Sequence, residues 1–501
     1  MRPAQVELFP SPSKGWVQSG NIVTAGRDQA EVMDNIWPSA EGGRLRGGCV
    51  EYADCAQAIT RLFVYKSGTA ETMFASGTNN IYDTAAPLVS VRAGLANGDW
   101  SVTQMTTAGG SFLIGANGAD PVWYYNGATF TASTITGVTS STLSQVWSFK
   151  ERLFFVEKNT LSVWYLPTES VAGAASEINL GSVFRKGGAI LFGANWSLDS
   201  GEGMDDVCLF VTDQGEIAVY EGTDPSSVST WSLTGVYEIA SPVDKHAFFK
   251  AGGDLAILTE DGIVPVSEAL RKDRAALQAS AITYPIEDAW KDVIANRSGG
   301  AVITATLWQA QTLLIVGTGA TDGGKNVAFV ANSRTGAWAR NLGWDVKCSV
   351  VFNDALYFVD SGGVVYTADS GGTDNGVQYT GHCVPKFTNS GQYRQAHSVG
   401  ITYRAPEELD FDLSLHGDYQ IDALPIPSPA TFASGDEWGT GVWGTFVWGN
   451  GTSVYTYRTW QFAGASGYAL APGVSITSNQ TAAIPFELLS MRVRFEEGSQ
   501  L

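Results

Sequence analysis

A short stretch near the C-terminus, EELDFDLSLHGDY (407–419), contains side chains of the types that bind metal ions. Apolar and polar residues alternate strictly along it, which predicts a strand with one apolar face. The donors on or near its polar side are Asp410, Asp412, His416 and Asp418. Donors two residues apart on one strand are separated by about 7 Å, too far for neighbours to share an ion easily. We therefore expect a solvated strand face, and a metal site is the less favoured interpretation.

Sequence patterns for catalysis are weak. The four histidines occur in no HExxH or HxH pattern, and neither a GxSxG elbow nor a phosphate-binding glycine loop is present. Propeller sialidases carry S-x-D-x-G-x-x-W boxes, but the stretch NSRTGAW (332–338) is one residue short and lacks the aspartate. Carboxylates are abundant, yet no motif selects the pair that a glycosidase needs. We predict no enzymatic activity, no catalytic residues and no cofactor.

Composition favours an all-β protein. The chain has 501 residues, of which 57 are glycine and only 16% are charged, and it is rich in Thr, Val, Tyr and Trp. Its net charge is −20, and an acidic surface repels phosphate, so tight binding of nucleic acid is not expected. Solubility alone would also explain the acidic excess.

The cysteines and the apolar runs indicate a chain that folds in a reducing compartment without crossing a membrane. Five cysteines at irregular spacing, with no CxxC, predict neither a disulfide framework nor a zinc site. The opening MRPAQVELFPSPSKGW lacks the apolar core of a signal peptide. No apolar run reaches 18 residues, so no membrane span is expected.

One local theme recurs from residue 58 onward: a short apolar run, a polar turn and a second strand. Examples are RLFVYKSGTAETMFAS, RLFFVEKNTLSVWYL and ALYFVDSGGVVYTAD. The repeats start roughly 40–60 residues apart, which is typical of propeller blades. We therefore predict a β-propeller of six or seven degenerate blades, with unrelated β-hairpins in sandwiches as the alternative.

The predicted organisation has three parts. Residues 1–25 form an N-terminal arm that we expect to pack on a partner or an adjacent subunit, and residues 26–376 form the β-propeller. Helical spacing in PVSEALRKDRAALQASAI and PIEDAWKDVIANR predicts a pair of short helices inserted near 265–297. Alternating strands from 377 to 501 predict a separate C-terminal β-sandwich, or platform, domain.

Two arginines in a glycine-rich motif form one candidate contact site. Arg44 and Arg46 lie amid four glycines in GGRLRGG (42–48). Glycine-rich backbone with arginines could form a phosphate cradle. We favour the simpler interpretation, in which the glycines form turns and the arginines pair with the acidic residues that are plentiful in this chain.

A tryptophan–glycine tract is the second candidate contact site. In DEWGTGVWGTFVWGN (436–450), Trp438, Trp443 and Trp448 recur every five residues, each followed by glycine. A spacing of five keeps residues on one face of neither a strand nor a helix. We expect an irregular loop whose indoles anchor against a neighbouring subunit or domain. A small core within the domain and glycan binding remain alternatives.

Three parts of the chain carry a family resemblance: DNIWPSAEGGRLRGGCVEYADC with the strands that follow it, EDGIVPVSEAL with residues 332–369, and the tryptophan–glycine tract with TWQFAGASGYALAPGVSI. Together they resemble the tail nozzle, or tail tubular, proteins of short-tailed bacteriophages. GRLRGG and the tract are the most distinctive elements. Tracts of the family often place aspartate between the tryptophans, where this chain has glycine and threonine.

The resemblance implies a virion structural protein that forms a hexameric ring below the portal and adaptor, with a lumen for ejection of double-stranded DNA. It implies the adaptor and tail fibre or needle proteins as partners. It also implies a place in the virion tail after assembly in the bacterial host cytoplasm. The rival hypothesis is a carbohydrate-binding or glycan-processing propeller protein that contacts the host surface through exposed tryptophans.

Overall fold

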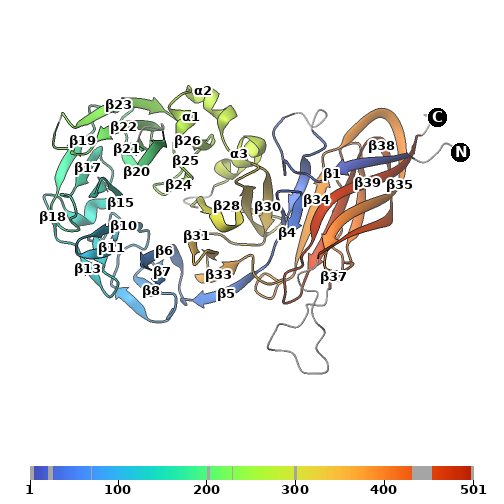
Figure 1. Ribbon diagram of the computed structural model, residues 1–501, viewed down its shortest axis with the longest axis horizontal. Coiled ribbons are helices and arrows are strands. Elements are labelled where there is room, and N and C mark those ends of the chain that lie inside the picture. The colour runs from blue at the N-terminus through green and yellow to red at the C-terminus, as the bar shows by residue number, and fades with distance from the viewer. Residues whose placement is uncertain are drawn as a thin grey trace.

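The protein consists of two β-rich parts that lie side by side (Figure 1). The computed structural model of the chain describes residues 5–20, 26–68, 70–199, 204–227, 229–297, 302–431 and 454–497. A ring of blades forms one part, and long strands beside the ring form the other. The first and last strands pair with each other within the part that lies beside the ring.

The ring is the predicted β-propeller. Six separate sheets of three or four antiparallel strands form blades around a common centre. In chain order, their strands are β6 (Ile59–Ser67), β7 (Ala70–Gly77), β8 (Asn80–Asp83), β9 (Ser90–Ala93); β10 (Ser101–Thr107), β11 (Gly110–Ala116), β12 (Trp123–Tyr125), β13 (Phe130–Ala132); β15 (Leu143–Phe149), β16 (Arg152–Glu157), β17 (Ser162–Tyr165), β19 (Ser176–Asn179); β20 (Ile190–Asp199), β21 (Met204–Thr212), β22 (Glu216–Gly222), β23 (Trp231–Glu238); β24 (Phe248–Ala251), β25 (Asp254–Thr259), β26 (Gly262–Pro265); and β31 (Cys348–Phe352), β32 (Ala355–Val359), β33 (Val364–Ala368) with β5 (Cys49–Asp54).

One further four-stranded unit completes the ring. It lies between the blades that begin with β24 and β31, and its strands are continuous with the C-terminal sheet. These strands are β27 (Thr304–Trp308), β28 (Leu313–Asp322), β29 (Lys325–Asn332) and β30 (Trp338–Leu342). A small parallel pair, β14 (Ile135–Thr136) and β18 (Gly173–Ala174), lies outside the blades.

The apolar runs of the sequence are strands covered on both faces. In β16, Leu153 and Phe155 pack into the core shared with the preceding blade, while Phe154 and Val156 pack into the core shared with the following one. All four side chains are fully buried. A strand buried on both faces has a continuous apolar sequence rather than an alternating one.

The predicted helical insertion is confirmed. Short helices α1 (Val266–Ala269) and α2 (Arg274–Leu277) and the longer α3 (Glu287–Ala295) follow β26 directly and precede β27. They cover a blade for which the described residues supply three strands. Trp290 of α3 is fully buried, and its indole N–H donates to the Thr259 carbonyl at 3.0 Å. The insertion therefore packs on the propeller's own core.

The C-terminal region is β, as predicted, but it also recruits N-terminal strands. Its strands are β1 (Gln5–Pro10), β2 (Ala30–Asp34), β3 (Ile36–Pro38), β4 (Gly43–Leu45), β34 (Tyr379–Pro385), β35 (Thr388–Ala405), β36 (Asp412–Gly417), β37 (Pro429–Ala430), β38 (Tyr455–Ser478) and β39 (Glu487–Glu497). Strand β38 pairs with β35 through its first half and with β34 and β36 through its second half. Side chains of both halves, such as Tyr457 and Ile476, pack into the same apolar core.

Two N-terminal segments pair outside the part of the chain in which they were predicted. Residues 30–45 were expected in the propeller; β2 and β4 pair with the C-terminal strands β34 and β39, whereas β3 pairs with β4 and packs on β29 and β30. The arm at residues 1–25 was expected to pack on a partner, but residues 5–10 pair with β39 of the same chain. In both cases the pairing partner lies more than 300 residues away in sequence, so no local pattern could indicate it.

The anchoring of β1 can be tested with Phe9, which is fully buried, and Val6, which is 53% exposed on the same strand. Phe9→Ala removes a buried aromatic ring and should lower the free energy of unfolding by about 3–4 kcal/mol. Val6→Ala, the matched control, should change it by less than about 1 kcal/mol. Urea unfolding of dilute protein, followed by fluorescence, measures both. Equal effects would mean that β1 is not anchored through Phe9.

Candidate functional site

Arg46 is a fully buried cation at the junction of the two parts. It follows β4 directly, and its guanidinium lies 4.8 Å from the Trp344 ring and 4.0 Å from the Tyr379 ring. Both terminal nitrogens donate to the Asp374 carboxylate at 2.7 Å. The remaining N–H groups donate to Asn35 Oδ1 and to the carbonyls of Gly47 and Leu342.

All the hydrogen-bonding capacity of Arg46 is therefore used within the chain. Burial acts to lower its pKa, but the Asp374 carboxylate outweighs burial and raises the pKa above the ordinary value. The contacts come from β34 of the C-terminal sheet, from β30 of the propeller and from the segment that follows β33, so Arg46 fastens the two parts together. Such a residue cannot also cradle a phosphate.

Arg44 makes a simpler contact at the same junction. It lies in β4, and its two terminal nitrogens donate to the Asp369 carboxylate at 3.1 and 2.7 Å. Asp369 follows the last strand of the propeller, β33. The prediction that both arginines pair with acidic neighbours is confirmed. Arg44 also lines a cavity of about 390 Å³ with Arg404, Phe486 and Glu487.

The tryptophans of the tract, Trp438, Trp443 and Trp448, lie outside the described residues. Their expected contact with a subunit or domain therefore stays a prediction.

The side chains of residues 407–419 that could bind a metal ion do not point toward a common centre. Asp410 and Asp412 are exposed as expected, and the Asp418 carboxylate accepts backbone N–H groups at residues 468 and 469. His416 was expected on the solvated side but is buried, and it hydrogen-bonds to Ser414 at 3.0 Å. Within the described ranges, no three His, Cys, Asp or Glu side chains are placed to hold a metal ion.

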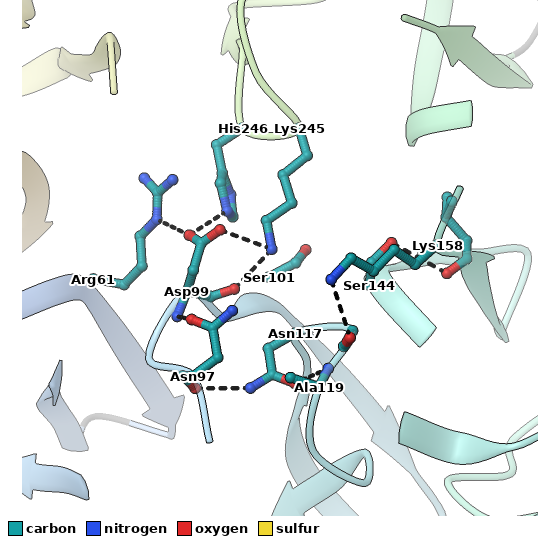
Figure 2. Close-up of polar contacts among 12 residues, drawn as sticks. Arg61, Asn97, Asp99, Ser101, Asn117, Ala119, Ser144, Lys158, Lys245 and His246 are labelled. Atoms are coloured by element: carbon teal, nitrogen blue, oxygen red, sulfur yellow. Dashed lines mark hydrogen bonds and ion pairs between the residues drawn. The ribbon is translucent and has the colours of Figure 1, made fainter. Parts of the chain in front are cut away.

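The sequence analysis missed a charged cluster at the centre of the propeller (Figure 2). We call Arg61, Asp99, Lys245 and His246 the Asp99 cluster. The Asp99 carboxylate accepts from Arg61 Nε at 2.8 Å, pairs with Lys245 Nζ at 2.9 Å and lies 3.0 Å from His246 Nε2. Lys245 also donates to the Asp99 carbonyl at 2.8 Å.

The Asp99 cluster links opposite sides of the ring. Arg61 lies on β6, and Asp99 lies in the loop before β10. Lys245 and His246 lie in the loop before β24, and β6 and β24 face each other across the centre (Figure 1). The hydrogen bonds therefore cross the propeller axis. A cavity of about 390 Å³ beside the cluster is lined by Asn97, Asn117, Ser144, Lys158 and Asp213.

The charges of the Asp99 cluster indicate a structural role rather than a catalytic one. Burial alone would raise the pKa of Asp99, but His246, Lys245 and Arg61 outweigh it and hold the pKa well below the usual range. Burial, aided by the charge of Arg61, lowers the pKa of His246 to about 4, although Asp99 acts in the opposite direction. At neutral pH the carboxylate is thus ionised, the imidazole is neutral, and Arg61 and Lys245 balance the carboxylate charge. A carboxylate this acidic is a poor general base.

All five cysteines lie buried and unpaired within the described chain. Burial raises the pKa of Cys49 to about 12 and the pKa of Cys55 to about 11, so these thiols stay protonated and unreactive at neutral pH. No helix in the described part of the chain is long and apolar enough to cross a membrane.

Comparison with known proteins gives no family. No family matches the sequence, and no curated protein matches it. Similar solved structures include the computationally designed Ika8 protein (12% identity, 64% of this chain, 99% of that chain, TM-score 0.35). They also include Sqt1 from Saccharomyces cerevisiae (11%, 64%, 98%, 0.34) and BamB from Moraxella catarrhalis (13%, 66%, 92%, 0.32). These scores are too low to support an argument about function.

The structural role of Arg46 predicts a difference between the two arginines. Arg46→Met leaves Asp374 as a partly buried, unpaired charge and should lower the free energy of unfolding by about 3–5 kcal/mol. Arg44→Met, the matched control at a more exposed ion pair, should cost about 1 kcal/mol or less. Chemical denaturation measures both values. A larger loss for Arg44→Met would contradict the assignment.

The lowered pKa of His246 predicts a loss of stability in mild acid. The unfolded chain takes up a proton on this histidine near pH 6.5, whereas the folded chain does so only near pH 4. Stability therefore falls as the pH drops through this window, by about 2 kcal/mol from this group between pH 7 and pH 5. In His246→Gln the fall should be smaller by that amount.

Urea midpoints at several pH values between 7 and 5 test this prediction while most carboxylates remain ionised. His397→Gln, at an exposed position, is the control and should retain the pH dependence of the unmodified protein. If the urea midpoints of His246→Gln and of the unmodified protein changed with pH in the same way, the prediction would be refuted.

Proposed function

We propose that this chain is a non-enzymatic structural subunit of a virion, a tail nozzle of the short-tailed bacteriophage type. Several copies form a ring around the path of double-stranded DNA, below the portal and adaptor. The observation that carries the proposal is the joint at Arg46. The GRLRGG element, one of the two most distinctive features of the resemblance, is also the element that fastens the propeller to the C-terminal sheet.

A rigid joint suits a conduit wall, which must keep its shape while DNA passes. The buried Arg46–Asp374 pair, the Arg44–Asp369 pair and the shared blade β27–β30 hold the two parts in one orientation. Geometry that depends on several simultaneous contacts resists deformation better than a single flexible linker. This supports a structural role in an assembly.

The contacts at the propeller axis favour a lumen that is formed between copies rather than within one chain. The Asp99 cluster crosses the axis, so its side chains lie where a polymer would have to pass. In the proposed assembly, DNA passes through the space that the copies enclose. The net charge of −20 suits a wall along which a polyanion slides without being held.

The second candidate is a carbohydrate-binding or glycan-processing propeller protein at the host surface. The observation that favours it is Trp460, whose side chain is 42% exposed on the C-terminal sheet. An exposed indole offers an apolar face and a polar N–H, both of which suit a sugar ring. The two candidate functions differ in the size of the functional unit, which is a ring of several copies for the tail nozzle and a monomer for the glycan-binding protein.

Electron micrographs of the purified protein, alone and mixed with the adaptor of the same virion, test the leading proposal. We expect rings with sixfold symmetry and an open lumen, formed alone or on the adaptor. Single propellers under both conditions would contradict it. Binding of glycans by the monomer at millimolar sugar, lost in Trp460→Ala, would favour the second candidate instead.

A further inference from the structure

One face of the C-terminal sheet has the composition of a contact surface. Strands β38, β35, β39 and β1 pair side by side in antiparallel register. Directly opposed residues of antiparallel strands point to the same side of a sheet. Two neighbouring rows on the side facing solvent, which we call the outer face, are Trp460, Gly400, Arg492 and Leu8, and then Phe462, Ser398, Arg494 and Val6.

The apolar side chains of the outer face are unusually exposed. Phe462 is 96% exposed, and Leu8 and Val6 are about half exposed at the other side of the same rows. The Trp460 indole lies directly against Gly400, where a Cβ atom would come within 2.7 Å of the ring. The glycine thus lets the indole lie flat on the sheet. Grouped apolar exposure of this kind marks an interaction site.

The charges of the outer face are positive in an acidic protein. Arg458, Arg492 and Arg494 point to this side, and none is joined by a hydrogen bond or ion pair to any part of the chain that the structure describes. Glu496 lies at the far end of the face. Carboxylates outnumber basic residues by 50 to 30 in this chain, so arginines that find no partner among the described residues and gather on one face indicate an acidic partner surface.

The opposite side of the same domain carries exposed carboxylates. Gln461 alternates with Trp460 on β38 and so points inward, where it hydrogen-bonds to the backbone of Phe411 and Leu413 at 2.7 and 2.8 Å. The segment 408–413 therefore covers the inner side of the sheet, with its apolar residues buried in the core. Its exposed acidic residues, which we call the acidic strip, are Glu408, Asp410 and Asp412.

We propose that the outer face of one copy docks on the acidic strip of the next copy. The inference rests on the proposed function and locates the contact that builds its ring. The two surfaces lie on opposite sides of one domain, so each copy offers both and the contact is head-to-tail. Contacts of this type generate closed rings when the rotation between copies closes.

The chemistry of the two surfaces is complementary. Arginine donates two parallel hydrogen bonds to a carboxylate, and tryptophan and arginine are the residues most enriched at the energetic centre of interfaces. In the docked arrangement Trp460 and Phe462 lose their contact with water, while the arginines pair with the strip. A second copy is therefore the occupant that the charges and the apolar side chains both favour.

Charge reversal tests the contact. Arg492→Glu with Arg494→Glu, or Asp410→Arg with Asp412→Arg, should each raise the dissociation constant of self-association at least about tenfold. The variant with all four changes restores opposite charges and should recover most of the association. Sedimentation velocity over a range of concentration and salt measures these constants, and far-UV circular dichroism checks the fold.

A matched apolar pair provides a second test. Phe462→Ser should weaken association, whereas Leu88→Ser, at a propeller loop residue that is 74% exposed, should not. Rings that persist unchanged in both charge-reversal variants would overturn the inference while leaving the proposed function standing. Failure of the unmodified chain to form rings, alone or on the adaptor, would instead refute the proposed function. Loss of adaptor binding alone, with self-association intact, would overturn a second copy as the occupant.

Discussion

The architecture depends on the pairing of β5 with β33. Each blade buries apolar residues against both neighbours, so an open ring would leave the faces of its first and last blades in water. Strand β5 precedes the first blade in sequence, yet it is the outer strand of the last one, paired from Ala368↔Cys49 to Val364↔Asp54. This pairing holds the two ends of the propeller together. The burial of every interblade core and the link across the axis both require that the ring stay closed.

Closure in this way fixes where the chain enters and leaves the propeller. The entering strand β5 and the leaving strand β33 are neighbours, so the segments that connect them to the C-terminal sheet cross at one point. A Cβ atom at Gly48 would lie 1.9 Å from the Thr373 carbonyl oxygen, and one at Gly47 would lie 2.7 Å from the backbone of Asp369. The glycines of GGRLRGG therefore permit the crossing, and Arg46 supplies the charge that pairs with Asp374 across it. The motif thus lets two backbone segments pass close to each other, and it also attaches the propeller to the C-terminal sheet.

Local patterns in the sequence predicted the local features of the fold. Continuous apolar runs such as that of β16 indicated blades, and helical spacing located α3. The pairing of Arg44 and Arg46 with carboxylates followed from the acidic composition. Contacts between distant segments could not be predicted in this way: β1 pairs with β39, and His246 meets Asp99 across 147 residues of sequence. His416 was misplaced for the same reason, because its burial depends on the residues that pack over its strand rather than on the alternation within it.

The rigid joint and the two surfaces of the C-terminal domain have a combined consequence in the proposed ring. If the outer face and the acidic strip set the angle between successive copies, the joint at Arg46 transmits that angle to the propellers. Each propeller then takes one orientation relative to the lumen, although it contributes nothing to the proposed contact itself. In the proposed assembly, the propeller surface is thereby left available for the proposed partners, the adaptor and fibre or needle proteins. In this arrangement the C-terminal domain forms the contacts between copies, and the propeller offers its surface to other proteins. This difference in role is the simplest reason for joining a closed propeller so firmly to a separate sheet.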